Sequence, residues 1–243
     1  MSEEKISDTD LLKSMLKPAS VNSPPIITIV GEGGMGKTTL GATFERPVFM
    51  RFEDGTSALQ SNEALTDRIG DIMQLPVIKN VGEEMNQLRL LGTTDHPFKT
   101  LVVDTISAMN ILYEHHVVST DSKNPKSINQ ACGGYGAGHS AVSEMHRQFQ
   151  ERCKRLREVK GMTIVFLCHA DIQDMELPDT DRYMKYTLRM NKRSVSHYTD
   201  DVDLVGHLRL VQHTFGDGDR KKISSNGSRM MTCYPIASSV SIL

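Results

Sequence analysis

The sequence contains no tryptophan, and aromatic residues make up only 5% of its 243 positions. A protein that binds nucleic acid by stacking bases on aromatic rings would have few rings to use. The cysteines form no CxxC pair, which argues against a zinc knuckle and against a redox dithiol; they are Cys132, Cys153, Cys168 and Cys233. Reduced thiols in a cytoplasmic protein are the simplest interpretation.

The chain also lacks long apolar runs and a strong charge of either sign. No uninterrupted apolar run approaches the roughly 20 residues that a membrane-spanning helix needs. The first residues are acidic, so they do not have the basic-then-apolar pattern of a signal peptide. A formal net charge of −2 argues against a protein that coats nucleic acid by charge alone, but it allows a local basic surface. We therefore expect a cytoplasmic protein without a membrane association.

Short apolar runs alternate with amphipathic stretches from residue 26 onward. The runs predict strands, several of them buried on both faces, at Ile26–Val30, Pro47–Phe52, Thr100–Val103, Thr163–Cys168 and Leu204–Gln212. Helical spacing predicts helices at Lys37–Phe44, over most of 59–92, at Ile106–Val117 and at 142–160. Strands that alternate with helices indicate an α/β fold with a mostly parallel central sheet flanked by helices.

Additions to this core are predicted at both ends of the chain. Residues 1–25 form an N-terminal extension, with a short amphipathic helix near Leu11–Leu16. A further strand is predicted at 183–190. The turn at Gly216–Asp219 predicts a β-hairpin addition toward the C-terminus, leading to a strand near Arg229–Tyr234.

The glycine-rich stretch after the first strand matches the phosphate-binding pattern GxxxxGK[ST] without a mismatch. Glycines allow successive backbone N–H groups to point at phosphate oxygens. Lys37 is placed to contact the β- and γ-phosphates, and the Thr38 hydroxyl to ligate Mg²⁺. The stretch lies between a strand and a helix, as the motif requires. We therefore predict that a nucleoside triphosphate binds at Gly31, Glu32, Gly33, Gly34, Met35, Gly36, Lys37, Thr38 and Thr39.

Carboxylates at the ends of two other strands suggest the rest of the catalytic site. Asp104 ends the strand Thr100–Val103 and would hold Mg²⁺ through a water. Thr105 follows it, so the chain lacks the Asp-Glu pair with which ABC and AAA+ ATPases activate water. The best candidate for a catalytic base is Glu53, which could orient a water beside the γ-phosphate. Asp54 is the alternative base, and a solvated turn residue is the simpler interpretation of Glu53.

This arrangement resembles the RecA/RadA superfamily, and more closely the phage-encoded RecA-like ATP-binding proteins that include the Sak-type single-strand annealing ATPases. The resemblance covers roughly residues 24–212 and is carried, beside the phosphate loop, by Val102-Val103-Asp104-Thr105, Gly134-Tyr135-Gly136 and Phe166-Leu167-Cys168-His169-Ala170. It implies a RecA-like P-loop ATPase domain over residues 26–243, ATP as the nucleotide, a base at Glu53 and a γ-phosphate sensor at His169. A histidine there could donate a hydrogen bond to the γ-phosphate, or it could only cap the strand end.

Two other P-loop classes fit less well. ParA-type partition ATPases carry a second lysine where this chain has Glu32, although Gly33–Thr39 looks very like their phosphate loop. A GTPase needs an NKxD motif, and Asn191-Lys192-Arg193-Ser194 has a serine where a carboxylate must bond the guanine edge. We interpret this segment as a chance match.

The resemblance also implies where DNA would bind. In RecA-like proteins, two loops that follow the Walker B helix and the sensor strand bind single-stranded DNA. The corresponding segments here are predicted to be loops, at 119–140 and 171–182. The first carries Lys123, Lys126 and Tyr135 among glycines, a composition that suits backbone contacts plus base stacking. The second is acidic, which suits DNA badly.

Basic residues elsewhere have two open interpretations. The helix at 142–160 is rich in arginine and lysine but also in glutamate, so its face either contacts DNA or, more simply, is solvated. One later basic residue could reach the ATP of a neighbouring subunit, and the candidates are Arg189, Lys192, Arg193, Lys221, Lys222 and Arg229.

These patterns and the resemblance lead to one main hypothesis. The protein is a phage or prophage ATPase, in the cytoplasm of an infected or lysogenic bacterium, that forms homo-oligomers on single-stranded DNA and assists annealing or recombination. A single-strand-binding protein is a candidate partner. The alternative is a nucleotide-dependent assembly or partition switch that binds protein rather than DNA. A degenerate P-loop protein that binds ATP with negligible turnover is the third interpretation.

Overall fold

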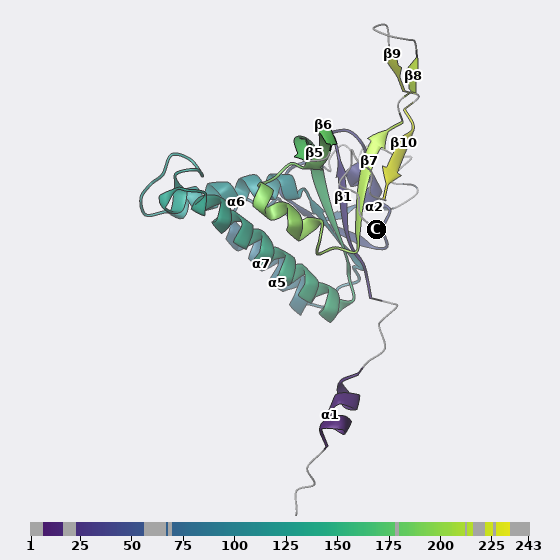
Figure 1. Ribbon diagram of the computed structural model, residues 1–243. Helices are drawn as coiled ribbons and strands as arrows, with labels where there is room; N and C mark the ends of the chain where they lie inside the picture. Colours follow the sequence, from purple (N-terminus) through teal and green to yellow (C-terminus); the bar gives the residue numbers. More distant parts are fainter. Residues whose placement is uncertain are drawn as a thin grey trace, which may run out of the picture.

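The structure is a computed structural model of the chain (Figure 1) and describes residues 7–16, 23–55, 67, 70–177, 180–211, 213–215, 222–225 and 227–233. Its helical segments include α1 (Asp8–Met15), α2 (Lys37–Ala42), α5 (Val81–Thr93), α6 (Ile106–Thr120), α7 (Ala137–Lys160), and the 3-10 segments η1 (Ala131–Gly133) and η2 (Lys192–Tyr198). Its strands are β1 (Ile26–Gly31), β2 (Pro47–Arg51), β3 (Met73–Gln74), β4 (Thr100–Asp104), β5 (Thr163–Leu177), β6 (Thr180–Leu188), β7 (Leu204–Leu210), β8 (His213–Phe215), β9 (Lys222–Ser224) and β10 (Arg229–Thr232).

The central sheet has the strand order β10-β7-β1-β5-β4-β2-β3, and β6 pairs with β5 outside this path. The pairs from β7 to β3 are parallel, whereas β10 is antiparallel to β7 and β6 is antiparallel to β5. A separate antiparallel pair joins β8 and β9. The predicted α/β class, with a mostly parallel sheet and hairpin additions toward the C-terminus, is confirmed. Among the described residues, no helix is both long and apolar enough to span a membrane.

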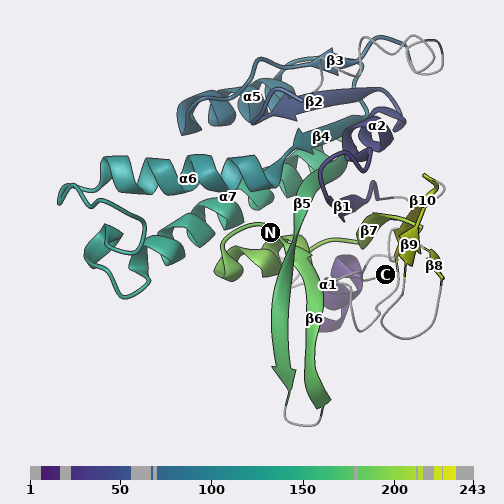
Figure 2. The ribbon, with the colours of Figure 1, turned by 90° about the horizontal axis from the view of Figure 1, so that it is seen from above.

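Both faces of the sheet are covered because its central strands are apolar on both sides. Every residue of β1 and of β4 is buried. Successive residues of a strand point to opposite faces, so Ile26 and Val30 join a core with α5, α6 and α7, while Ile27 and Ile29 join a second core with α2. In Figure 2, α5, α6 and α7 lie on one side of the sheet and α2 on the other.

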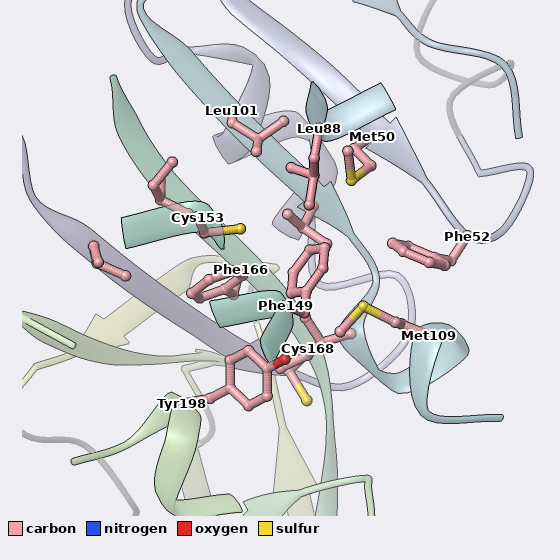
Figure 3. Packing of buried hydrophobic residues seen from close by; sticks show 14 of the residues in the cluster. Met50, Phe52, Leu88, Leu101, Met109, Phe149, Cys153, Phe166, Cys168 and Tyr198 are labelled. Atoms are coloured by element: carbon pink, nitrogen blue, oxygen red, sulfur yellow. The ribbon is translucent and has the colours of Figure 1, made fainter. Parts of the chain in front are cut away.

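The larger core is built around stacked aromatic and sulfur-containing side chains, which Figure 3 shows. The ring of Phe149 on α7 packs between Phe52 and Phe166, with centroid distances of 6.4 and 6.3 Å. Phe166 on β5 meets Tyr198 edge to face at 4.9 Å. These contacts anchor the long helix α7 against the centre of the sheet, and so hold the strand ends that carry polar residues in a rigid frame.

The structure confirms several predicted elements and corrects others. The short N-terminal helix is present as α1, and its described side chains are exposed. The segment 171–182 is not a loop: β5 runs on from Thr163 to Leu177 and pairs with β6 in a hairpin that projects from the sheet (Figure 2). Residues 70–80, which lie in the stretch predicted to be mostly helical, contain no helix and include β3, whereas α5 confirms the helical prediction over Val81–Thr93.

Two further boundaries differ from the prediction or cannot be compared with it. The helix predicted from residue 142 begins at Ala137, directly after the glycines of the preceding loop. The predicted turn at Gly216–Asp219, most of the predicted helical stretch 59–69, and Tyr234 lie outside the described residues.

Candidate active site

The register of the parallel strands brings the predicted site residues to one edge of the sheet. Gly31 at the end of β1 is paired with His169 on β5, and Asp104 at the end of β4 is paired with Leu167. Asp104 is also paired with Arg51, two residues before Glu53. Because the carboxyl ends of parallel strands meet at the same edge, the phosphate loop, Asp104, Glu53 and His169 gather there although up to 138 positions separate them in sequence.

The phosphate loop has the backbone that its glycines were expected to allow. Gly34 and Gly36 have φ angles of 75° and 89°, in the left-handed region that favours glycine. At Gly31, a Cβ atom would lie 2.7 Å from the Leu208 carbonyl oxygen of the adjacent strand β7. Lys37, only 6% exposed, donates hydrogen bonds of 2.9 Å to the carbonyl oxygens of Gly31 and Glu32. The backbone of the phosphate loop therefore surrounds the ammonium group of Lys37.

The remaining loop residues flank this turn. Glu32, Gly33 and Gly34 are exposed, whereas the other side chains are half-buried: Met35, Thr38 and Thr39. An exposed turn of backbone with a buried ammonium group beneath it fits a polyphosphate, whose oxygens can replace the carbonyl partners of Lys37.

Lys37, His169 and Glu53 form a contiguous chain of polar contacts. Lys37 Nζ lies 3.4 Å from His169 Nδ1, and His169 Nε2 lies 3.4 Å from Glu53 Oε1. An ammonium group can only donate, so Nδ1 accepts in this contact and the ring proton sits on Nε2, facing Glu53. This contact with His169 is the main reason why the pKa of Glu53 lies below its ordinary value, with a hydrogen bond from Thr105 adding to it. Glu53 is therefore held ionised beside the phosphate loop.

The alternative base, Asp54, points elsewhere. Its carboxylate is largely exposed and forms an ion pair with Arg51 at 3.1 Å. No contact joins Asp54 to the lysine or the histidine of the site within the described residues. The geometry thus favours Glu53 over Asp54 as the catalytic base. It also argues against the interpretation of Glu53 as an isolated solvated turn residue.

Asp104 and Thr38 together offer oxygen ligands for a divalent cation. Asp104 is only 4% exposed, and burial raises the pKa of its carboxyl to about 6, although a hydrogen bond from Thr38 opposes this effect. A buried carboxylate of this kind is stabilised when a cation approaches, and Mg²⁺ prefers oxygen ligands. The described residues contain no cluster of three His, Cys, Asp or Glu side chains suited to a metal. The residues fit a Mg²⁺ ion that shares its ligands with nucleotide phosphates and water.

Burial also affects the lysine of the site. Desolvation lowers the pKa of Lys37, while the nearby groups Cys168, Asp104 and Glu53 act in the opposite direction. A lysine buried between two carboxylates and a loop of backbone is thus positioned as a local positive charge without solvent around it, where its interaction with a phosphate is strong.

Three further residues contact the site, and the sequence patterns do not assign any of them to the site of its own subunit. The Thr105 hydroxyl is hydrogen-bonded to Glu53, and the Ser107 Oγ accepts a hydrogen bond of 3.0 Å from the His169 backbone N–H. Both follow Asp104 closely, so their place at the start of α6 could have been a signal. The third, Arg229, lies beside Gly36; the sequence suggested it only as one of several basic residues that could reach the ATP of a neighbouring subunit.

The predicted DNA loop lies away from the phosphate loop. Lys123, Lys126 and Tyr135 are exposed in the segment that joins α6 to α7, at the end of these helices far from α2 (Figure 2). α6 has 15 residues and starts two positions after Asp104, so it spans about 22 Å between the catalytic edge and this segment. The structure therefore does not bring these three residues to the ATP site.

The loop presents Tyr135 to solvent through an unusual backbone. Five successive residues have positive φ angles, and they are Cys132 (56°), Gly133 (91°), Gly134 (82°), Tyr135 (50°) and Gly136 (82°). Three of these are glycines, which adopt such angles at little cost, whereas a tyrosine there is strained. The Tyr135 side chain is completely exposed. Such strain at an exposed aromatic ring is consistent with a binding role.

Most basic residues of α7 are used inside the chain. Arg147 pairs with Glu144 and Glu151, and three others pair with residues of different elements: Arg152 with Glu84, Lys154 with Asp201 and Arg157 with Asp203. This arrangement agrees with the simpler interpretation of that helix, in which its charges are balanced locally rather than presented to DNA.

Two of the later basic residues can be placed directly. Arg193 donates to the Gly136 carbonyl at 3.2 Å, and so ties η2 to the loop before α7. Arg189 donates to the Ala170 carbonyl at 3.1 Å. The chance match to a guanine motif is also explained, since Asn191 is buried and its amide donates to the His139 carbonyl. Lys221 lies outside the described residues.

Comparison with known proteins identifies the family of the chain. A family model described as an AAA domain matches residues 23–235, and the chain belongs to this family of P-loop ATPases. The chain is also similar to the SPbeta prophage-derived uncharacterized protein YorG of Bacillus subtilis (strain 168), with 23% identity over 201 residues. That stretch is 83% of this chain and 54% of the relative, so the chain spans about half the length of the curated protein that it matches. The prediction of a phage-associated P-loop ATPase is thereby supported.

Proposed function

We propose that this AAA-domain protein is a Mg²⁺-dependent ATPase of phage origin, of the RecA-like type, that assembles on single-stranded DNA in the host cytoplasm and assists annealing or recombination. The observation that carries the ATPase proposal is the gathering of Lys37, Thr38, Asp104, Glu53 and His169 at one sheet edge. Each comes from a different strand end or from the phosphate loop, as an NTP-hydrolysing site requires.

The residues divide the work of hydrolysis among them. Lys37 exchanges its carbonyl partners for β- and γ-phosphate oxygens. Thr38 and Asp104 would hold a Mg²⁺ ion, which would neutralise charge on the phosphates. Glu53 orients a water and accepts its proton as the water oxygen bonds to the γ-phosphorus. The bond from that phosphorus to the bridging oxygen breaks, so the products are ADP and inorganic phosphate.

His169 connects these events. Its Nε2–H faces Glu53 and its Nδ1 faces Lys37. When Lys37 turns to the phosphates, His169 loses a donor on one side and is free to reorient toward the γ-phosphate. This shift gives the chain a means to distinguish ATP from ADP.

The DNA part of the proposal rests on the loop between α6 and α7. It combines two exposed lysines, Lys123 and Lys126, with the fully exposed ring of Tyr135. Basic side chains that follow a phosphate backbone together with a ring on which bases stack are the usual means of binding single strands without sequence preference. The loop is far from the ATP site, so we propose that homo-oligomers align such loops along one strand.

The ATPase proposal is tested with three variants. Lys37→Ala should abolish ATP binding. Glu53→Gln should retain the ATP dissociation constant but lower kcat by about a hundredfold or more, because the amide cannot take a proton. Asp54→Asn is the matched control, since Asp54 is paired with Arg51, and it should retain normal turnover. Turnover at the wild-type rate in Glu53→Gln would remove Glu53 as the base.

The DNA proposal is tested by fluorescence anisotropy with a labelled single-stranded oligonucleotide at low salt, with and without ATP. Tyr135→Ala should weaken binding by about 1–3 kcal/mol if the ring stacks on a base. Tyr135→Phe keeps the ring and should bind like the wild type. Absence of ATP-dependent binding in the wild type would contradict the DNA role and favour the alternative, a nucleotide-dependent assembly switch that binds protein.

A further inference from the structure

The edge strand β10 crosses beside the phosphate loop of its own chain. β10 is antiparallel to β7, with Arg229 paired to Leu210, and β7 is the neighbour of β1, from which the loop emerges. A Cβ atom at Gly36 would lie 3.7, 3.8 and 3.9 Å from Nε, Cζ and Cδ of Arg229. The guanidinium group is therefore in van der Waals range of the residue directly before Lys37, although 193 positions separate the two in sequence.

Packing around β7 keeps β10 in this place. Gly206 on β7 has no side chain, and a Cβ atom there would come within 2.7 Å of the sulfur of Met231. Met231 thus occupies the space above Gly206. Because side chains of a strand alternate between its faces, Arg229 and Met231 share one face of β10. The contact of Met231 with Gly206 therefore fixes the orientation of β10, in which the Arg229 side chain points toward the phosphate loop.

Nothing in the described part of the chain neutralises Arg229. Its side chain is exposed, and it takes part in none of the ion pairs among the described residues. The other arginine close to the site, Arg189, donates to a backbone carbonyl. A guanidinium group held beside a phosphate-binding loop without a carboxylate partner is suited to an anionic ligand, which its planar fork can bind in a bidentate manner.

We propose that Arg229 binds the phosphates of the nucleotide held in the phosphate loop of the same subunit, an inference that rests on the proposed ATPase function. Sequence alone left Arg229 among several residues that could reach a neighbouring subunit's ATP. Its place on the sheet beside Gly36 assigns it to its own site. The backbone of the loop, which includes Gly36, cradles the α- and β-phosphates, whereas Lys37 reaches the β- and γ-phosphates. Because Arg229 lies beside this part of the loop, it should contribute to the binding of ADP as well as to the binding of ATP.

The test is a nucleotide-binding titration of the full chain with Mg²⁺-ATP and Mg²⁺-ADP. Arg229→Ala should weaken the binding of both nucleotides about tenfold, which corresponds to about 1.4 kcal/mol. Arg229→Lys keeps the positive charge but loses the planar guanidinium fork. Its dissociation constants for both nucleotides should therefore lie between those of the wild type and those of Arg229→Ala. Arg155→Ala is the control: Arg155 is exposed on α7, on the other face of the sheet, and should bind like the wild type. Urea unfolding of each variant confirms that the fold is retained.

The outcomes separate this inference from the ATPase proposal. If Lys37→Ala loses binding while Arg229→Ala binds both nucleotides like the wild type, the role of Arg229 is refuted and the ATPase proposal stands. If Arg229→Ala bound ATP more weakly but ADP like the wild type, the inference would also be overturned, because Arg229 would then contact the γ-phosphate. If the wild type binds neither nucleotide, both proposals fail.

A mixing experiment decides between the subunit's own site and a neighbour's. Arg229→Ala and Lys37→Ala subunits are mixed, and ATP binding is measured. If Arg229 acts within its own subunit, every site in the mixture lacks one of the two residues, and binding stays low. Recovery of binding on mixing would show that Arg229 acts across the interface and would contradict the inference.

Discussion

The buried carboxyl group of Glu84 should lower the free energy of unfolding of this protein as the pH rises from 4.5 to about 7. Its side chain on α5 is fully buried and accepts a hydrogen bond of 2.6 Å from the Tyr113 hydroxyl of α6. Arg152 of α7 lies 3.6 Å from its other oxygen. Burial raises the pKa of Glu84 from 4.5 to about 7, although Tyr113 and Arg152 both oppose the shift. We therefore propose the substitution Glu84→Gln, which removes the charge and retains an acceptor for Tyr113.

The sign and size of the effect follow from this shift. A carboxyl group with a raised pKa binds its proton more tightly in the folded than in the unfolded state. The contribution of Glu84 to the free energy of unfolding therefore falls between about pH 4.5 and pH 7 and is constant at higher pH. Each pKa unit corresponds to 1.36 kcal/mol, and the interval from pH 5 to pH 8 covers most of the shift. The free energy of unfolding of Glu84→Gln relative to wild type should therefore rise by about 2–3 kcal/mol across this interval.

The assay is urea unfolding of both proteins at pH 5, 6, 7 and 8, followed by circular dichroism. Glu158→Gln is the matched control, because Glu158 is an exposed carboxylate on α7, and its difference from wild type should not depend on pH. A Glu84→Gln difference that is the same at pH 5 and pH 8 would refute the reasoning. It would mean that Arg152 and Tyr113 keep the buried carboxylate ionised at no cost.

Three further predictions address the site and the frame that holds it. Asp104→Asn should raise the Mg²⁺ concentration that half-saturates ATP binding by about 10–100-fold, measured by titrating Mg²⁺ at fixed nucleotide; an unchanged midpoint would exclude Asp104 as a ligand. Asn80→Ala should lower the free energy of unfolding by about 1 kcal/mol, because the Asn80 side chain caps α5 by accepting from the Glu83 N–H at 3.0 Å; an unchanged urea midpoint would argue against this cap. Phe149→Ala should cost about 3–5 kcal/mol, since Phe149 is fully buried in the larger core; a loss below 1 kcal/mol would show that this core repacks.

Several features of the protein are determined by short stretches of sequence. Runs of apolar residues specify β1 and β4 because burial on both faces leaves no other place for them. The glycines of residues 31–36 specify the phosphate loop because few other residues reach its φ angles. Asp104, Glu53 and His169 could be expected at one edge of the sheet because each lies at or just past the end of a predicted strand, and parallel strands end at a common edge.

Other features were decided only by contacts between distant segments. The stretch 171–182 is polar, a composition that predicts a loop, but residues 171–177 continue β5 and pair with β6, which satisfies their backbone hydrogen bonds. The burial of Glu84 depends on α6 and α7 closing over it. Arg229 comes beside Gly36 only because β10 joins the sheet next to β7. Local sequence specifies what a few neighbouring residues prefer, whereas strand pairing and burial depend on partners far along the chain, which no short pattern contains.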